Sequence, residues 1–240
     1  MGKIRILAVS SSRVGNGGYL ESVAPVIEIF LGNTPLNIAF IPFASVNADY
    51  EIYAHNVRMG LSALPYSIRT VTVANAKEII EKADVVMVGG GNTFKLLHDL
   101  YAMCLLDVIK TKVQNGTPYI GWSAGSNIAG ETICTSNDMP IINPGSFIGL
   151  DFFPFQINPH YYNQPMVGFN GETRDQRLSE FLQLNPGKQV VALPEGTALL
   201  LENGCLKLLG TANALLFRWQ NDRAILTELE RDKELTFLMQ

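Results

Sequence analysis

The 240-residue sequence contains few cysteines, few histidines and no long apolar run. Its three cysteines, Cys104, Cys134 and Cys205, are widely spaced and form no C-x-x-C pair. A disulfide framework or a zinc site is therefore not expected, and each cysteine is predicted to be a small buried residue. No segment reaches the roughly 18 apolar residues of a membrane span, and the N-terminal apolar stretch is too short for a signal peptide. These absences predict a protein of the reducing cytoplasm.

An excess of positive charge is also missing. The 18 Lys and Arg residues are outnumbered by 22 Asp and Glu residues, which gives a formal net charge of −4. This balance argues against nucleic acid or an anionic membrane as the partner. Affinity for an acidic substrate would then depend on a few well-placed arginines. With 47% hydrophobic residues and no repeat or linker, residues 1–240 are predicted to form a single domain.

Short apolar runs alternate with helical patterns along the first half of the chain. The alternation and the continuous Val and Ile runs predict an α/β fold with a mostly parallel sheet and helices on both faces. The predicted strands there are residues 4–10, 36–43, 68–73, 84–88 and 118–120. The predicted helices are residues 19–31, 52–64, 76–82, 93–100 and 105–113, and a later helix is predicted at 173–184.

Beyond residue 123 the alternation gives way to short strands. Asn203-Gly204 is a strong turn signal between two of them, so C-terminal β-hairpins are predicted. The predicted strands there are residues 190–193, 198–201, 206–209 and 215–219, with one or two more within 223–238.

The most informative motif is Gly121-Trp122-Ser123-Ala124-Gly125, which has the form G-x-S-x-G. A strand is predicted directly before it, and a helix is predicted over residues 124–129. In a nucleophile elbow the serine occupies a strained strand-to-helix turn from which its Oγ projects. The alternative is an ordinary Gly-rich turn with a capping serine. The strand before and the helix after favour Ser123 as a nucleophile.

A second glycine-rich loop, Gly89-Gly90-Gly91-Asn92, follows the predicted strand 84–88. Ligands bind at the carboxyl ends of parallel strands, so this loop and Ser123 are predicted to be neighbours. We interpret the N–H groups of Gly91 and Ala124 as an oxyanion hole, because glycine lets a backbone N–H approach a reacting carbonyl closely. A phosphate-binding loop is disfavoured, since neither G-x-G-x-x-G nor G-x-x-x-x-G-K-[ST] is present. A purely structural turn is the other alternative.

A serine nucleophile needs a base, and the sequence offers three histidines. His55 and His98 lie in amphipathic helical patterns typical of surface residues. His160 follows an apolar strand and Pro159, which fixes it at the end of an element. By elimination His160 is the predicted general base. The orienting carboxylate is either Glu195 or Asp138, and the residues alone do not settle this choice. We favour Glu195, because the Pro194-Glu195-Gly196 loop fixes it at a strand end, and we expect Asp138 nearby, where it tunes the site or binds the substrate's amino group.

Six motifs stand in order along the chain, at residues 89–94, 121–125, 136–140, 156–160, 171–174 and 193–196. Together they resemble the serine peptidase family that contains peptidase E and cyanophycinase, and the resemblance extends from about residue 4 to 219. It implies a flavodoxin-like, class I glutamine-amidotransferase-like fold. It also implies a cytoplasmic homodimer that hydrolyses dipeptides with an N-terminal aspartate and needs no metal or organic cofactor. Ser123 would be the nucleophile, His160 the base and Glu195 or Asp138 the acid.

The same resemblance implies where a substrate aspartate would bind. Arg174 opens the predicted helix 173–184, where its guanidinium could hold a carboxylate through two parallel hydrogen bonds. Arg177 lies three residues on, on the same helical face, and either assists or is solvated. Asn92 and Thr93 are further predicted donors to this carboxylate. The expected partner is therefore a small peptide.

Three other functions share parts of this pattern. An α/β-hydrolase esterase shares the elbow, but its histidine comes late in the chain, and no histidine follows His160. A glutamine amidotransferase would have cysteine in place of Ser123. A catalytically silent binding module on this fold is expected to lose Ser123 or His160, and both are present.

Overall fold

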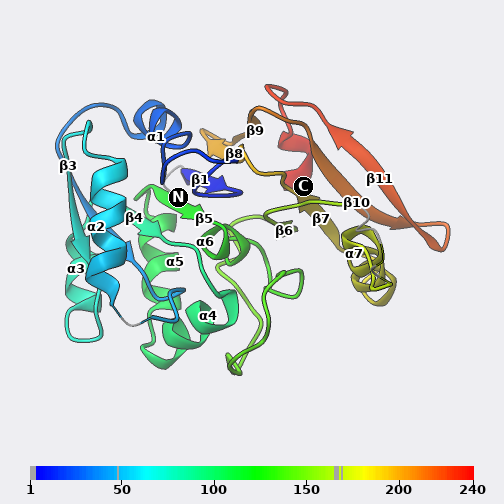
Figure 1. Ribbon diagram of the computed structural model, residues 1–240, viewed down its shortest axis with the longest axis horizontal. Helices are drawn as coiled ribbons and strands as arrows, with labels where there is room; N and C mark the ends of the chain where they lie inside the picture. Colours follow the sequence, from blue (N-terminus) through cyan, green and yellow to red (C-terminus); the bar gives the residue numbers. More distant parts are fainter. Residues whose placement is uncertain (1–3, 48, 165–167, 169) are drawn as a thin grey trace.

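The computed structural model describes residues 4–47, 49–164, 168 and 170–240, and these residues form two sheets (Figure 1). The larger sheet has seven strands in the order β3-β2-β4-β5-β1-β8-β9. Its first five strands are parallel, and β8 and β9 extend it as an antiparallel edge. The parallel strands are β1 (Ile6–Val9), β2 (Leu36–Ile41), β3 (Tyr66–Thr70), β4 (Val85–Val88) and β5 (Tyr119–Trp122). The edge strands are β8 (Thr197–Glu202) and β9 (Cys205–Gly210).

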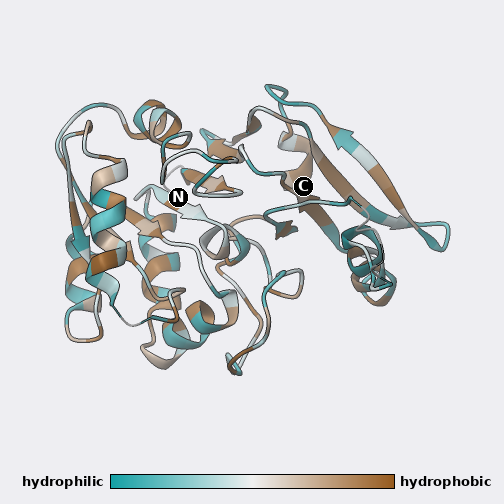
Figure 2. Cartoon of the chain, viewed as in Figure 1, coloured by the Kyte–Doolittle hydropathy of each residue, from teal (hydrophilic) through white to brown (hydrophobic). Residues whose placement is uncertain are grey.

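Helices cover both faces of this sheet. Successive side chains of a strand point to opposite faces, so in β1 Ile6 and Ala8 join one buried cluster while Leu7 and Val9 join another. The helices carry both polar and apolar residues (Figure 2), as is typical of amphipathic helices. On the Ile6 face lie α3 (Ala76–Lys82), α4 (Thr93–Ala102), α5 (Leu106–Gln114) and the short α6 (Ala124–Asn127). On the Leu7 face lie α1 (Ala24–Leu31) and α2 (Tyr50–Gly60).

The smaller sheet has the order β11-β10-β7-β6 and is covered by α7 (Arg174–Leu184) (Figure 1). Leu178 and Leu182 of α7 pack against Val190 and Phe217 of the sheet. One buried cluster includes side chains of both sheets. The strands are β6 (Gln156–Asn158), β7 (Gln189–Ala192), β10 (Ala214–Gln220) and β11 (Arg223–Leu229).

The predicted α/β fold class, with its parallel sheet and C-terminal antiparallel strands, is confirmed. Most element ends agree with the sequence prediction to within about two residues. The first helix is an exception: it begins at Ala24 rather than at residue 19, because Leu20 has a positive φ of 58° and Pro25 suits a first helical turn. The segment 223–238 forms one strand and a short 3₁₀ helix (Thr236–Met239).

Two-residue turns close both C-terminal hairpins. Asn203 and Gly204 connect β8 to β9 with positive φ angles of 55° and 77°, as the sequence predicts. Asn221 and Asp222, with φ angles of 51° and 57°, connect β10 to β11. β7 and β8, however, are consecutive strands that lie in different sheets.

The prediction that the cysteines are buried is wrong. Cys104 and Cys134 are exposed, and Cys205 is partly exposed. Cys104 follows α4 in a turn with a φ of 54°, and Cys134 lies in a loop, so neither side chain can pack into a sheet. None of the helices that the structure describes is long and apolar enough to cross a membrane.

Candidate active site

Ser123 lies in the sharp turn between β5 and α6. Its backbone angles are φ 54° and ψ −113°, a strained conformation for a residue with a side chain. Both flanking glycines are required by space: a Cβ on Gly121 would overlap the Gly125 carbonyl, and a Cβ on Gly125 would overlap that of Val88. The sequence G-x-S-x-G therefore forms a nucleophile elbow in this chain.

His160 is positioned at the end of β6 with its ring toward this turn. Its Nε2 lies 2.9 Å from the Ser123 Oγ. The backbone of His160 has a φ of 52°, and its N–H donates to the Ser10 hydroxyl at 2.9 Å. The Ser10 hydroxyl in turn donates to the Leu193 carbonyl at 2.8 Å. Ser10 thus ties the loops after β6 and β7 to the end of β1.

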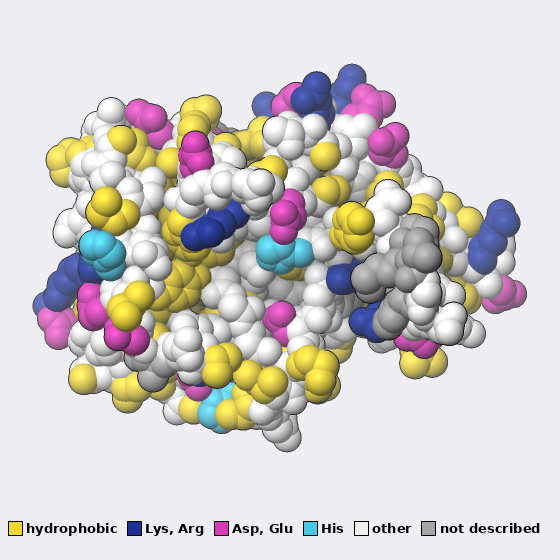
Figure 3. Space-filling view, in the orientation of Figure 1, with side chains coloured by type: hydrophobic (Ala, Val, Ile, Leu, Met, Phe, Trp, Pro, Cys, Tyr) yellow, Lys and Arg dark blue, Asp and Glu magenta, His cyan; other side chains and the backbone are white. Residues whose placement is uncertain are grey.

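Glu195 occupies the other side of the His160 ring. Its Oε1 lies 2.8 Å from Nδ1, so the imidazole bridges Ser123 and Glu195. The His160 and Glu195 side chains are 40% and 49% exposed, so a substrate can reach the row formed by Ser123, His160 and Glu195. In the space-filling view, a histidine and an acidic side chain lie together in the middle of this face, with basic side chains on both sides (Figure 3).

Asp138 makes no hydrogen bond or ion pair with His160 among the described residues. Its Oδ2 accepts hydrogen bonds from the Thr93 N–H at 2.7 Å and the Thr93 hydroxyl at 2.6 Å. The Asn92 side chain caps α4 by accepting from the Lys95 N–H at 3.0 Å and donates to the Met139 carbonyl at 2.9 Å. The predicted substrate donors Asn92 and Thr93 are therefore engaged within the protein, and they hold the Asp138 loop against α4.

The triple glycine packs directly on the elbow. A Cβ on Gly90 would come within 2.8 Å of the Ser123 Cβ, and Gly91, with a φ of 137°, packs against the Ala44 carbonyl. Only glycine fits this close approach. Ala124 is the first residue of α6, where a backbone N–H has no intrahelical acceptor. Among the described residues, no backbone or side-chain acceptor takes the N–H of Gly91 or Ala124.

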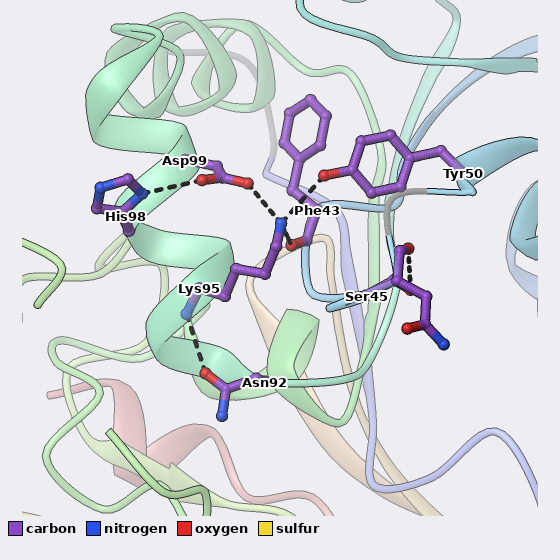
Figure 4. A network of polar contacts seen from close by, with 8 residues as sticks. Phe43, Ser45, Tyr50, Asn92, Lys95, His98 and Asp99 are labelled. Atoms are coloured by element: carbon purple, nitrogen blue, oxygen red, sulfur yellow. Dashed lines mark hydrogen bonds and ion pairs between the residues drawn. The ribbon is translucent and has the colours of Figure 1, made fainter. Parts of the chain in front are cut away.

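Lys95 fixes the loop that carries Ala44 (Figure 4). Its Nζ donates to the Phe43 carbonyl at 2.9 Å, to the Tyr50 hydroxyl at 3.0 Å and to Asp99 at 2.6 Å. Burial alone would lower the pKa of Lys95, but the contacts with Asp99 and Tyr50 raise it, so the side chain stays charged. This network joins the loop after β2 to α4. Because Gly91 packs against Ala44 in that loop, the network also holds the surface on which the glycine loop rests.

Arg174 is the first residue of α7 and is half-buried. Its Nη1 is buried and has no hydrogen-bond partner among the described residues. Burial, and then the positive charge of Arg177, lowers the pKa of the Arg174 guanidinium. Tyr161 and then Asp138 raise this pKa, but by less. Arg177 itself is 58% exposed and lies 3.7 Å from Glu172. Arg174 thus has a buried Nη1 that is unpaired among the described residues, and it lies within electrostatic reach of Asp138.

Two supporting residues were not predicted from the sequence. The buried Ser10 hydroxyl bonds the His160 N–H and the Leu193 carbonyl, in the loops after β6 and β7. Lys95 bonds the Phe43 carbonyl in the loop against which Gly91 packs. For Ser10 the available signal was a polar residue directly after a buried strand. Among the described residues, no group of three or more His, Cys, Asp or Glu side chains is arranged to hold a metal ion.

A model of Peptidase family S51 matches residues 6–209 of this sequence. The chain belongs to peptidase family S51. Two relatives named "Peptidase E" agree with this. The relative from Nostoc sp. is 49% identical over 224 residues, which cover 93% of this chain and 92% of the relative. The relative from Haemophilus influenzae is 50% identical over 201 residues, which cover 83% and 92%.

Solved structures confirm the fold of this S51 peptidase. A candidate peptidase E from Listeria monocytogenes has a TM-score of 0.66 at 21% identity and covers 87% of this chain and 99% of its own. A peptidase from an actinobacterium has a TM-score of 0.69 at 17% identity, with 98% of both chains covered. The prediction of a serine dipeptidase of this family is confirmed by the closely similar sequences, and neither the esterase nor the silent binding module is favoured.

Proposed function

We propose that this S51 peptidase hydrolyses dipeptides with an N-terminal aspartate through a seryl acyl-enzyme. The observation that carries the proposal is the row of three side chains in which His160 lies 2.9 Å from Ser123 and 2.8 Å from Glu195. A base within hydrogen-bond reach of a hydroxyl, itself oriented by a carboxylate, is the arrangement that activates a serine.

The reaction proceeds in two halves. His160 Nε2 accepts the Ser123 proton while Oγ attacks the peptide carbonyl, and the N–H groups of Gly91 and Ala124 stabilise the oxyanion. The C–N bond then breaks, and His160 passes the proton to the leaving amine. His160 then takes a proton from water as the water attacks the acyl-enzyme carbonyl. The oxyanion collapses, the C–O bond to the Ser123 Oγ breaks, and His160 returns the proton to Oγ, which releases aspartate and restores the serine hydroxyl. Glu195 stabilises the imidazolium in both halves. None of these steps requires a metal or an organic cofactor.

The N-terminal residue of the substrate carries two charges, and the site has a group for each. Arg174 would bind the aspartate side chain, because its buried Nη1 lacks a partner among the described residues. Asp138, within electrostatic reach of Arg174, would bind the α-amino group. A substrate that lacks either charge leaves one of these groups without a counter-charge. Selectivity then comes from the penalty for that unpaired group.

We expect a clear preference when Asp-Leu, Asn-Leu, Glu-Leu and Ala-Leu are compared side by side. A hydrogen bond to a charged group contributes about 1.5–3 kcal/mol, so kcat/KM for Asp-Leu should exceed that for Asn-Leu by roughly 10- to 150-fold. Arg174→Ala should remove most of this ratio. Arg177→Ala is the matched control, because that side chain is exposed and already near Glu172. Equal hydrolysis of Ala-Leu by the wild type would disprove the aspartate preference.

We also propose that the protein acts as a homodimer in the cytoplasm. The support is the resemblance of its six motifs to the peptidase E family. Sedimentation velocity at micromolar concentration should then give a dimer of the 26.4 kDa chain. A single monomer species across a tenfold dilution series would remove this proposal without affecting the chemistry.

A further inference from the structure

The hydroxyl of Tyr53, on α2, lies between the two loops that form the site. It donates to the Gly90 carbonyl at 3.0 Å and accepts from the Trp122 indole Nε1 at 3.2 Å. Trp122 directly precedes Ser123, so this one hydroxyl connects the nucleophile elbow to the triple glycine. The contact is close, since a Cβ on Gly89 would come within 2.5 Å of the same oxygen.

The orientation of one peptide follows from this contact. In a trans peptide the C=O of one residue and the N–H of the next point in opposite directions. Because Tyr53 holds the Gly90 carbonyl, the Gly91 N–H is directed away from α2. Gly90 and Gly91 flank this peptide, and their free φ and ψ angles would let the whole peptide plane rotate easily if nothing held it. Burial raises the pKa of Tyr53, so its hydroxyl stays protonated and remains a donor.

We propose that Tyr53 is a positioning residue that fixes the Gly90–Gly91 peptide so that the Gly91 N–H serves as an oxyanion donor. This inference depends on the proposed function, which places that N–H in the oxyanion hole. The Tyr53 hydroxyl contacts the Gly90 carbonyl and the Trp122 indole rather than Ser123 or His160. It acts on the transition state through the peptide, and the enzyme binds its substrate equally well without it.

Tyr53→Phe tests the proposal, since it removes the hydroxyl and keeps the ring. We expect kcat to fall on the order of 10-fold with KM unchanged. This is less than the roughly 10²–10³-fold that follows complete loss of an oxyanion donor, because the N–H is still present. Tyr66→Phe is the matched control: its hydroxyl also donates to a glycine carbonyl, that of Gly32 at 2.6 Å, but on β3 and away from the site.

A second measurement separates positioning from stability. The aldehyde analogue of the N-terminal residue forms a hemiacetal with Ser123, and its oxygen occupies the oxyanion position. Tyr53→Phe should raise the dissociation constant of this aldehyde by the same factor by which it lowers kcat/KM. If Tyr53→Phe lowers the unfolding temperature but leaves kcat and aldehyde affinity at wild-type values, the hydroxyl is only structural and the proposal is wrong.

The proposed aspartate preference can fail without affecting this test. The kinetic comparison uses whichever dipeptide of the four-member panel the wild type cleaves fastest, and the aldehyde corresponds to that residue. A wild type that prefers Ala-Leu would overturn the specificity but would still report the effect of Tyr53→Phe on kcat.

Discussion

Ser123→Ala is expected to lower kcat on the best dipeptide by on the order of 10³-fold or more, with the fold intact. The Oγ is the atom that bonds to the substrate carbonyl, and no other hydroxyl of the described residues lies beside the His160 Nε2. The elbow keeps its shape, because alanine tolerates the Ser123 backbone angles as well as serine does. Turnover and thermal unfolding of the purified variant are the measurements.

Ser126→Ala is the matched control for this substitution. Ser126 lies in the same elbow, but its hydroxyl is fully buried within hydrogen-bond distance of the Val9 and Gly121 carbonyls. It does not contact His160, so near wild-type turnover is expected. If Ser123→Ala retained turnover within tenfold of the wild type, Ser123 could not be the nucleophile, and another activated group would have to be sought.

The parallel half of the fold was predictable because its signals are local. The inner strands β1, β4 and β5 are buried at every position and are therefore continuous apolar runs, and amphipathic patterns separate the runs. The edge strand β3 is buried on one face only, so its apolar and polar residues alternate. The partition of the later strands was not predictable in this way. β8 and β9 join the central sheet, whereas β7 and β10 are the inner strands of the second sheet. All four are short apolar segments, and their partners depend on which sheet edge is free once the chain has collapsed.

The site shows the same division. Ser123, Gly91 and His160 could be proposed from the sequence because each follows a strand, and such ends converge. The sequence favours Glu195 over Asp138 only because the Pro194-Glu195-Gly196 loop fixes it at a strand end, and it does not settle the choice. Only the folded chain shows which carboxylate faces the imidazole, and a contact across 35 residues leaves no local pattern.

Glu195→Gln is expected to lower kcat on the order of 10²–10⁴-fold, with little change in shape. The amide cannot stabilise the imidazolium by charge, and its NH₂ group can favour the wrong histidine tautomer. Because the Glu195 side chain is 49% exposed, water replaces part of the lost stabilisation. We therefore expect a value near the lower end of this range. The measurement is kcat at saturating dipeptide for variants whose unfolding temperatures match the wild type.

Asp138→Asn is the matched comparison, since it makes the same carboxylate-to-amide change in the neighbouring loop. Its carboxylate accepts hydrogen bonds from Thr93 and its charge acts on Arg174, whereas Glu195 is the carboxylate on His160. The loss should therefore fall mainly on KM, through the substrate's α-amino group. The two variants thus separate the functions of the carboxylates: Glu195 acts on kcat and Asp138 on substrate binding. A larger loss of kcat in Asp138→Asn than in Glu195→Gln would exchange these assignments, because the orienting acid is the one whose charge the imidazolium needs in the transition state.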